Sequence, residues 1–138
     1  MAMPDLLAFD FGLCRIGVAV GQTITRTANP IEFLRARDGI PDWEDIAKLI
    51  QKWQPDKILV GIPLTMEDEE QHLTHCARKF ANRLKEKFGV EIETVDERLT
   101  TKDARARMFD EGGFGALKKG KVDSVAAAIM LEDWFLTH

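Results

Sequence analysis

The chain has no tyrosine, only two cysteines and no surplus of positive charge. Cys14 and Cys76 are too few for a disulfide framework, so we expect both thiols to be reduced. The formal net charge is −4, which argues against the broad basic surface that non-specific nucleic-acid binders carry. Any contact with phosphate groups is therefore expected to be local.

Long apolar runs are also missing, since none approaches the length of a membrane span. The first ten residues, MAMPDLLAFD, lack the basic start and the long apolar core of a secretory signal. We therefore expect a cytoplasmic protein. Its 138 residues, 45% of them hydrophobic, suit one domain over residues 1–138 with a single core.

Hydrophobic residues recur with the two-residue period of a strand in some segments and with the period of a helix in others. This pattern predicts five strands and four helices. Three strands come first, and strands alternate with helices afterwards, which favours a mixed five-stranded α/β sheet with helices on both faces. Asp42 is a plausible N-cap for the first helix, and Gly89 ends the second. The strands are expected at residues 6–9, 15–20, 24–34, 56–63 and 90–95, and the helices at 43–53, 73–88, from Thr100 or Thr101 to 111, and 122–135.

Acidic residues stand at the ends of these apolar elements. Asp10 ends the first strand, where a buried carboxylate is costly unless something compensates its charge. Asp96 and Glu97 follow the last strand, and Asp123 opens the final helix. The small side chains at 126–128 would let that helix approach the sheet closely. We expect three of these acids to meet where the strand ends meet.

A cluster of three carboxylates would need positive charge. Two like charges about 4 Å apart repel by about 4 kcal/mol at an effective dielectric of about 20. Oxygen ligands without histidine or cysteine suit Mg²⁺ or Mn²⁺. A pair of such ions can activate water and stabilise the leaving oxygen of a phosphodiester. The pattern therefore predicts metal-dependent phosphoryl chemistry.

Several of these residues also have ordinary structural explanations. Asp10 could cap the turn through Gly12, and Asp123 could sit favourably in the first turn of its helix. A run of lysines is usually solvated, but the stretch KKGK lies immediately ahead of Asp123. We therefore predict that a few local cations contact substrate phosphates, namely Arg15, Arg98, Lys118, Lys119 and Lys121.

Four segments, AFDFGLCRIGVAVG, ILVGIPL, VDERLTT and KGKVDSVAAAIMLEDWF, are similar to the successive motifs of the YqgF family. Its members are ribonuclease H-like proteins described as pre-16S rRNA nucleases and earlier as Holliday-junction resolvases. The resemblance implies a ribonuclease H-like fold, dependence on Mg²⁺ or Mn²⁺, and trimming of the 5′ end of pre-16S rRNA in the pre-ribosomal particle. Carried over by motif, Asp10, Glu97 and Asp123 are the catalytic and metal-binding acids, with Asp96 as the alternative to Glu97.

The sequence departs from the family pattern at three places. Leu13 and Cys14 replace the Thr and basic residue that relatives often have, and an acidic run occupies residues 67–70. Gly61 and Pro63 lie where many ribonuclease H-like nucleases have an acid.

Three alternatives to the rRNA nuclease function stay open. The first is a resolvase of branched DNA, which requires a homodimer rather than a monomer. The other two are a nucleotide-binding module and an RNA-binding assembly factor that does not cut.

Overall fold

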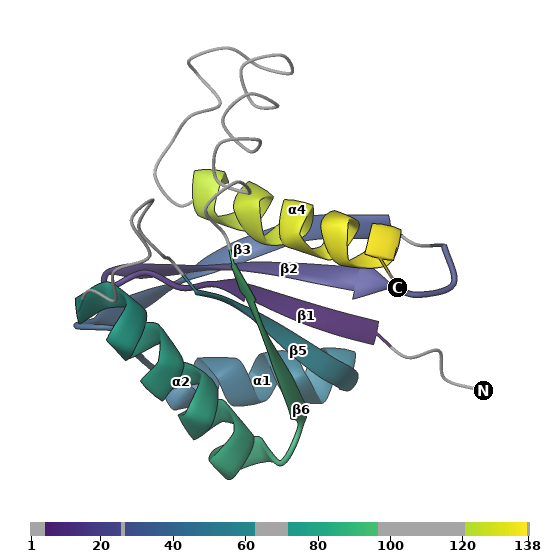
Figure 1. Ribbon diagram of the computed structural model, residues 1–138. Coiled ribbons are helices and arrows are strands. Elements are labelled where there is room, and N and C mark those ends of the chain that lie inside the picture. The colour runs from purple at the N-terminus through teal and green to yellow at the C-terminus, as the bar shows by residue number, and fades with distance from the viewer. Residues whose placement is uncertain (1–4, 26, 63–71, 97–120, 138) are drawn as a thin grey trace.

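The structure is a computed structural model that describes residues 5–25, 27–62, 72–96 and 121–137. The side chains of residues 72, 73, 96, 121–124 and 137 are not among those described. A mixed sheet lies between helices on its two faces (Figure 1). The predicted helix that ends near residue 111 lies outside the described residues. No helix in the described part of the chain is long and apolar enough to cross a membrane.

The sheet has the strand order β4-β3-β2-β1-β5-β6. The first four strands pair antiparallel, and β5 and β6 run parallel to β1. The predicted α/β class is therefore confirmed, and the buried run of β5 lies between two parallel neighbours as expected. The strands are β1 (Asp5–Asp10), β2 (Arg15–Gln22), β3 (Thr27–Arg37), β4 (Ile40–Pro41), β5 (Pro55–Ile62) and β6 (Glu91–Asp96).

In the described part of the chain the sheet has six strands, one more than the five expected from the sequence. The additional strand, β4, has only two residues, which is too short for an alternating pattern to show. It pairs with the end of β3 through a turn at Asp38 and Gly39, whose φ angles are 52° and 80°. The third strand also begins and ends about three residues later than its hydrophobic pattern indicated.

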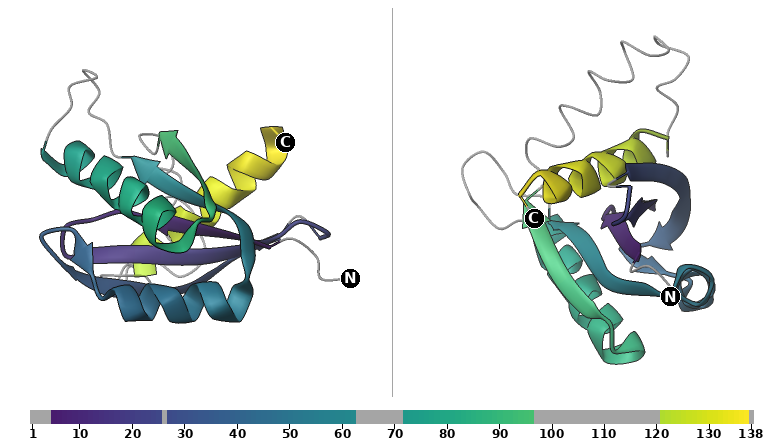
Figure 2. Two further views of the ribbon diagram at one scale, coloured as in Figure 1. Left: turned by 90° about the horizontal axis from the view of Figure 1, so that it is seen from below. Right: turned by 90° about the vertical axis from the view of Figure 1, so that its right-hand side faces the viewer.

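The helices cover both faces of the sheet (Figure 2). Helices α1 (Trp43–Trp53) and α2 (His72–Phe88) lie on one face, and α4 (Lys121–Thr137) lies on the other. The predicted N-cap is confirmed, because the Glu44 backbone N–H donates to the Asp42 carboxylate at 2.9 Å. The predicted end of α2 is confirmed as well, because Gly89 has a φ of 65° and its N–H donates to the Lys85 carbonyl at 2.9 Å.

Two turns at one edge of the sheet are joined by backbone hydrogen bonds. The Gly39 N–H donates to the Leu13 carbonyl at 2.9 Å, and the Ala36 N–H donates to the Cys14 carbonyl at 2.8 Å. A Cβ atom at position 39 would lie only 2.6 Å from Cζ of Phe11, the residue that follows Asp10. The β3–β4 turn therefore helps to hold the end of β1 in place.

Two glycine substitutions test this packing. Gly89→Ala places a side chain in a left-handed conformation with no heavy atom within 4 Å, so it is expected to lower the free energy of unfolding by about 1–2 kcal/mol. Gly39→Ala has the same backbone cost and adds the contact with Phe11, so its loss should be larger. Urea denaturation of both variants measures the difference; equal losses would show that the turn does not hold Phe11.

Candidate active site

Asp10 is the last residue of the central strand β1, and its side chain is only 7% exposed. Its partner on β2 is Gly17, and its partner on β5 is Gly61. Neither neighbour has a side chain, so no side chain from the adjoining position of β2 or β5 lies beside the carboxylate. Gly61 lies at a position where many ribonuclease H-like nucleases have an acid. In the structure it is the partner of Asp10 on the parallel strand β5.

The alternation of β1 assigns Asp10 to the face covered by α4. Leu6 and Ala8 belong to the core cluster that contains residues of α4, whereas Leu7 and Phe9 belong to the cluster beneath α1 and α2. Successive side chains of a strand point to opposite faces. Asp10 continues the series of Leu6 and Ala8.

Helix α4 approaches this face through small side chains. Ala127 and Ala128 pack in the same cluster as Ala8 and Ala19 of the sheet, which confirms the close approach expected from the alanine-rich sequence. The helix begins at Lys121, at the edge of the sheet where β1 ends (Figure 1). The first turn of α4, which includes Asp123, is therefore at the edge that carries Asp10.

Strand β6 reaches the same edge. Its residue Val95 pairs with Gly61, and its last residue Asp96 pairs with Ile62. Glu93 and Val95 both contact the α4 side, since Glu93 bonds to Trp134 and Val95 packs on the cluster under α4. The odd-numbered positions of β6 thus belong to the face of Asp10. Glu97, which follows β6 directly in the chain, lies outside the described residues.

Three polar groups of α4, β5 and β6, the Trp134 indole, the Lys57 ammonium and the Glu93 carboxylate, hold the helix against the sheet. The Trp134 indole N–H donates to Glu93 at 2.8 Å, and the Lys57 ammonium donates to the other Glu93 oxygen at 3.2 Å. The Lys57 nitrogen also lies 5.3 Å from the centre of the Trp134 ring. The spacing of residues in the sequence does not reveal this group, because Lys57 and Trp134 lie 36 and 41 residues from Glu93.

The predicted phosphate contacts are only partly visible. Arg15 begins β2, is half-buried and pairs across the sheet with Arg35 of β3. Both arginines line a hollow of about 300 Å³ between the β1–β2 turn and β3. Arg35 is a candidate contact that sequence analysis missed, because the register of β2 and β3 brings it beside Arg15. The side chain of Lys121 is not described, and Arg98, Lys118 and Lys119 lie outside the described residues.

The structure describes the three predicted acids to different extents. Asp10 and the backbone at Asp123 lie at one edge of the sheet, whereas Glu97 and the side chain of Asp123 are outside the described set. Among the side chains that the structure describes, no group of three His, Cys, Asp or Glu residues could hold a metal ion. The meeting of the three acids therefore stays a prediction.

A family model with the description "Holliday junction resolvase", that of RuvX, matches residues 4–137. The chain belongs to the RuvX family. A protein of Shewanella oneidensis named "Putative pre-16S rRNA nuclease" is 60% identical to this RuvX-family chain over 138 residues, covering 100% of this chain and 98% of that protein. A protein of the same name from Escherichia coli is 58% identical over 130 residues, covering 94% of each. The resemblance to the YqgF family is thereby confirmed.

Solved structures confirm the fold of this RuvX-family chain. Thermus thermophilus RuvC in complex with a Holliday junction superposes with a TM-score of 0.56 at 15% identity, covering 97% of this chain and 94% of that one. The fowlpox virus resolvase in complex with junction DNA gives 0.57 at 12% identity, covering 96% and 99%. At such low identity these matches show a common ribonuclease H-like fold and nothing about the substrate.

Variants of Glu93 test how α4 is held. Glu93→Ala leaves the Trp134 N–H and Lys57 without their common acceptor, so the free energy of unfolding should fall by about 1–3 kcal/mol. Glu93→Gln keeps an acceptor for Trp134 and should lose less. Glu91→Ala, at an exposed site of the same strand, is the control and should change little. Equal effects of Glu93→Ala and Glu91→Ala in urea denaturation would contradict this role.

Proposed function

We propose that this RuvX-family protein is a metal-dependent nuclease of the cytoplasm that trims the 5′ end of pre-16S rRNA during ribosome biogenesis. The observation that carries the proposal is the buried Asp10, which ends the central strand between Gly17 and Gly61 on the face covered by α4. The names of the curated relatives support pre-16S rRNA as the substrate.

Asp10, Glu97 and Asp123 are the proposed catalytic acids. Asp10 comes from β1, Asp123 from the first turn of α4, and Glu97 from the segment after β6. Glu97 continues the odd-numbered series of Glu93 and Val95, which favours it over Asp96 as the second acid. The anchor of Glu93 to Trp134 supports this arrangement by fixing α4 relative to β6.

The same three acids are the proposed ligands of Mg²⁺ or Mn²⁺. A buried carboxylate offers the oxygen ligands that a hard cation prefers, and its two glycine neighbours place no side chain beside it. When bound, such ions supply the positive charge that polarises a phosphodiester and assists the ionisation of water. The three carboxylates would hold such ions at this edge of the sheet.

The cations around the acids are proposed to position the RNA. Arg15 and Arg35 face one hollow at the β1–β2 turn, next to the end of β1, and can hold a phosphate beside the scissile one. The proposed contacts in the segments that flank the other two acids are Arg98, Lys118, Lys119 and Lys121.

A second candidate substrate is branched DNA, because the family model has the description "Holliday junction resolvase". Paired cuts across a junction require a symmetric dimer, so this alternative predicts a homodimer in solution. A non-catalytic RNA-binding factor is the third candidate, and it predicts RNA binding without cleavage. Incubation with pre-16S rRNA and with a four-way DNA junction, each with Mn²⁺ or with chelator, separates the three.

The Asp10→Asn and Asp123→Asn variants test the acids. Each should abolish Mn²⁺-dependent cleavage of pre-16S rRNA and, without metal, leave the melting temperature equal or higher because repulsion is relieved. Asp56→Asn, which changes an exposed aspartate at the far end of β5, is the control and should cleave normally.

Metal titration gives an independent measure of the same site. At a Mn²⁺ concentration about 100 times its dissociation constant, the free energy of unfolding of the wild-type protein should rise by about 2.7 kcal/mol. The rise for Asp10→Asn should be smaller. A lower metal-free melting temperature of both Asn variants, together with an unchanged response to Mn²⁺, would indicate structural roles instead.

A further inference from the structure

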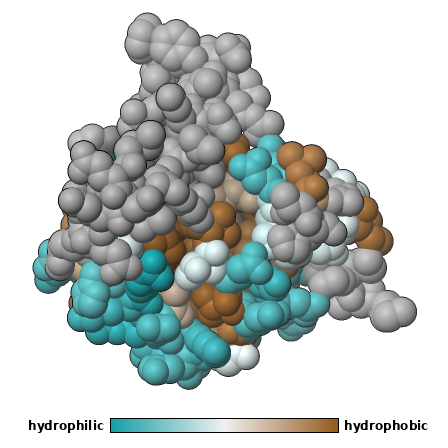
Figure 3. Space-filling model, viewed as in Figure 1, coloured by the Kyte–Doolittle hydropathy of each residue, from teal (hydrophilic) through white to brown (hydrophobic). Residues whose placement is uncertain are grey.

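Helix α2 carries a concentration of positive charge in a chain whose net charge is negative. Its exposed side chains between positions 78 and 87 include five cations and a single carboxylate, Glu86. Hydrophilic residues accordingly cover α2 at the lower left of the space-filling view (Figure 3). The five cations are Arg78, Lys79, Arg83, Lys85 and Lys87.

Three of the cations form a row along one side of α2. Lys79, Arg83 and Lys87 are four residues apart, and such residues neighbour each other on a helix at steps of about 6 Å. Lys79 and Arg83 line a hollow of about 390 Å³ between α2 and the β3–β4 turn, and the Lys87 nitrogen lies 5.2 Å from the centre of the Trp43 ring. This set of three is called the α2 row below.

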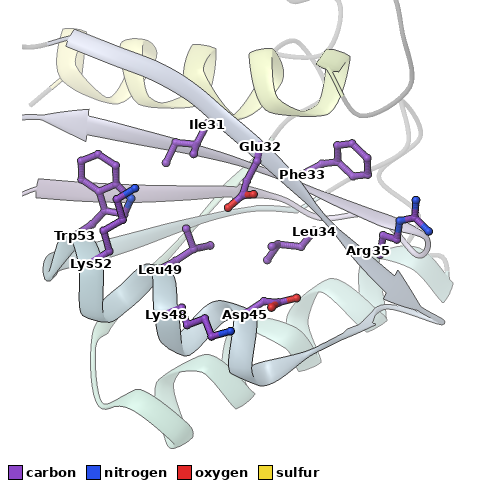
Figure 4. A pocket seen from close by; sticks show the side chains of 10 residues that line it. All are labelled: Ile31, Glu32, Phe33, Leu34, Arg35, Asp45, Lys48, Leu49, Lys52 and Trp53. Atoms are coloured by element: carbon purple, nitrogen blue, oxygen red, sulfur yellow. The ribbon is translucent and has the colours of Figure 1, made fainter.

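Few acids lie beside the α2 row in the described part of the chain, namely Glu86 on α2 itself and Asp38. Lys79 and Arg83 form no ion pair there, and Asp38 is the only acid that lines their hollow. The hollow of about 420 Å³ between β3 and α1 is different (Figure 4). Around it, the cations are interspersed with the carboxylates of Glu32 and Asp45. Arg35, Lys48 and Lys52 are those cations.

The α2 row also has a direction relative to the proposed active site. The first turn of α2 lies at the edge of the sheet where β1 ends and α4 begins, and the helix runs from there towards the opposite edge (Figure 1). Lys79 is therefore the member nearest to that edge, and Lys87 is the farthest. Because Asp10 belongs to the face covered by α4 and α2 lies on the other face, an RNA strand that leaves the site must pass around this edge of the sheet to continue along α2.

We propose that the α2 row binds successive phosphates of a single RNA strand, at a distance from the bond that is cut. The inference rests on the proposed function, because that function supplies the RNA. Steps of about 6 Å are comparable with the spacing of neighbouring phosphates along a strand, and lysine and arginine are the usual phosphate contacts. The row thus supplies affinity and orientation and takes no part in the chemistry.

The test measures RNA binding without cleavage. A labelled transcript that contains the 5′ end of pre-16S rRNA is titrated with the full-length protein in chelator, by fluorescence anisotropy, at several salt concentrations. The variant Lys79→Gln/Arg83→Gln/Lys87→Gln should bind about 10- to 100-fold more weakly at about 0.1 M salt. The slope of log K against log salt should become shallower by about 2, as expected for three lost contacts to a single strand.

Two further variants keep the test decisive. Arg37→Gln/Lys48→Gln/Lys52→Gln removes three other exposed cations and should bind almost as the wild type does. Lys79→Arg/Arg83→Lys/Lys87→Arg keeps the charge of the row and should retain both the affinity and the salt slope. Melting curves establish that all three variants are folded.

The inference is overturned if the wild-type protein does not bind the transcript, or if the Gln variants of the two surfaces lose affinity equally. It is also overturned if the charge-keeping variant loses affinity as the Gln variant does. Cleavage by the wild type together with unchanged affinity of the α2 variant would refute the α2 row and leave the proposed nuclease function standing. Weaker binding together with no cleavage would support the row and refute the nuclease.

Discussion

The burial of one carboxylate constrains the rest of the site. Asp10 is 7% exposed at the end of the central strand, and a buried charge must be compensated to persist. Its two neighbours in the sheet, Gly17 and Gly61, have no side chains. In the proposed function cations compensate this charge, and their positive charge would in turn allow further acids to gather there.

The architecture brings three elements to the edge of the sheet where Asp10 lies. Parallel pairing of β1, β5 and β6 places the carboxyl ends of these strands together. Helix α4 begins there, lies close to the sheet through Ala127 and Ala128, and is tied to β6 near its far end by Trp134 and Glu93. Catalysis at this edge would therefore depend on packing and hydrogen bonds well away from the acids.

Most of the fold could be predicted because its elements have strong local patterns. The buried run of β5, the Asp42 cap and the stop at Gly89 each follow from nearby residues, and each is confirmed. The two-residue β4 has no periodic pattern, and the pairing of Arg15 with Arg35 depends on strand register over 20 residues. The α2 row was missed for another reason, since a net charge of −4 conceals a local surplus of cations.

The distribution of charge thus suits the proposed nuclease that acts on a single RNA strand. Cations gather on α2 and at the hollow of Arg15 and Arg35, while Asp10 ends β1 on the face of the sheet that α4 covers. The most direct test of the central claim is anomalous scattering from crystals of the protein soaked in Mn²⁺. The account predicts a manganese peak within coordination distance of the carboxylates of Asp10, Glu97 and Asp123. Side chains that point to different places, or an arginine that fills the space between them, would contradict it.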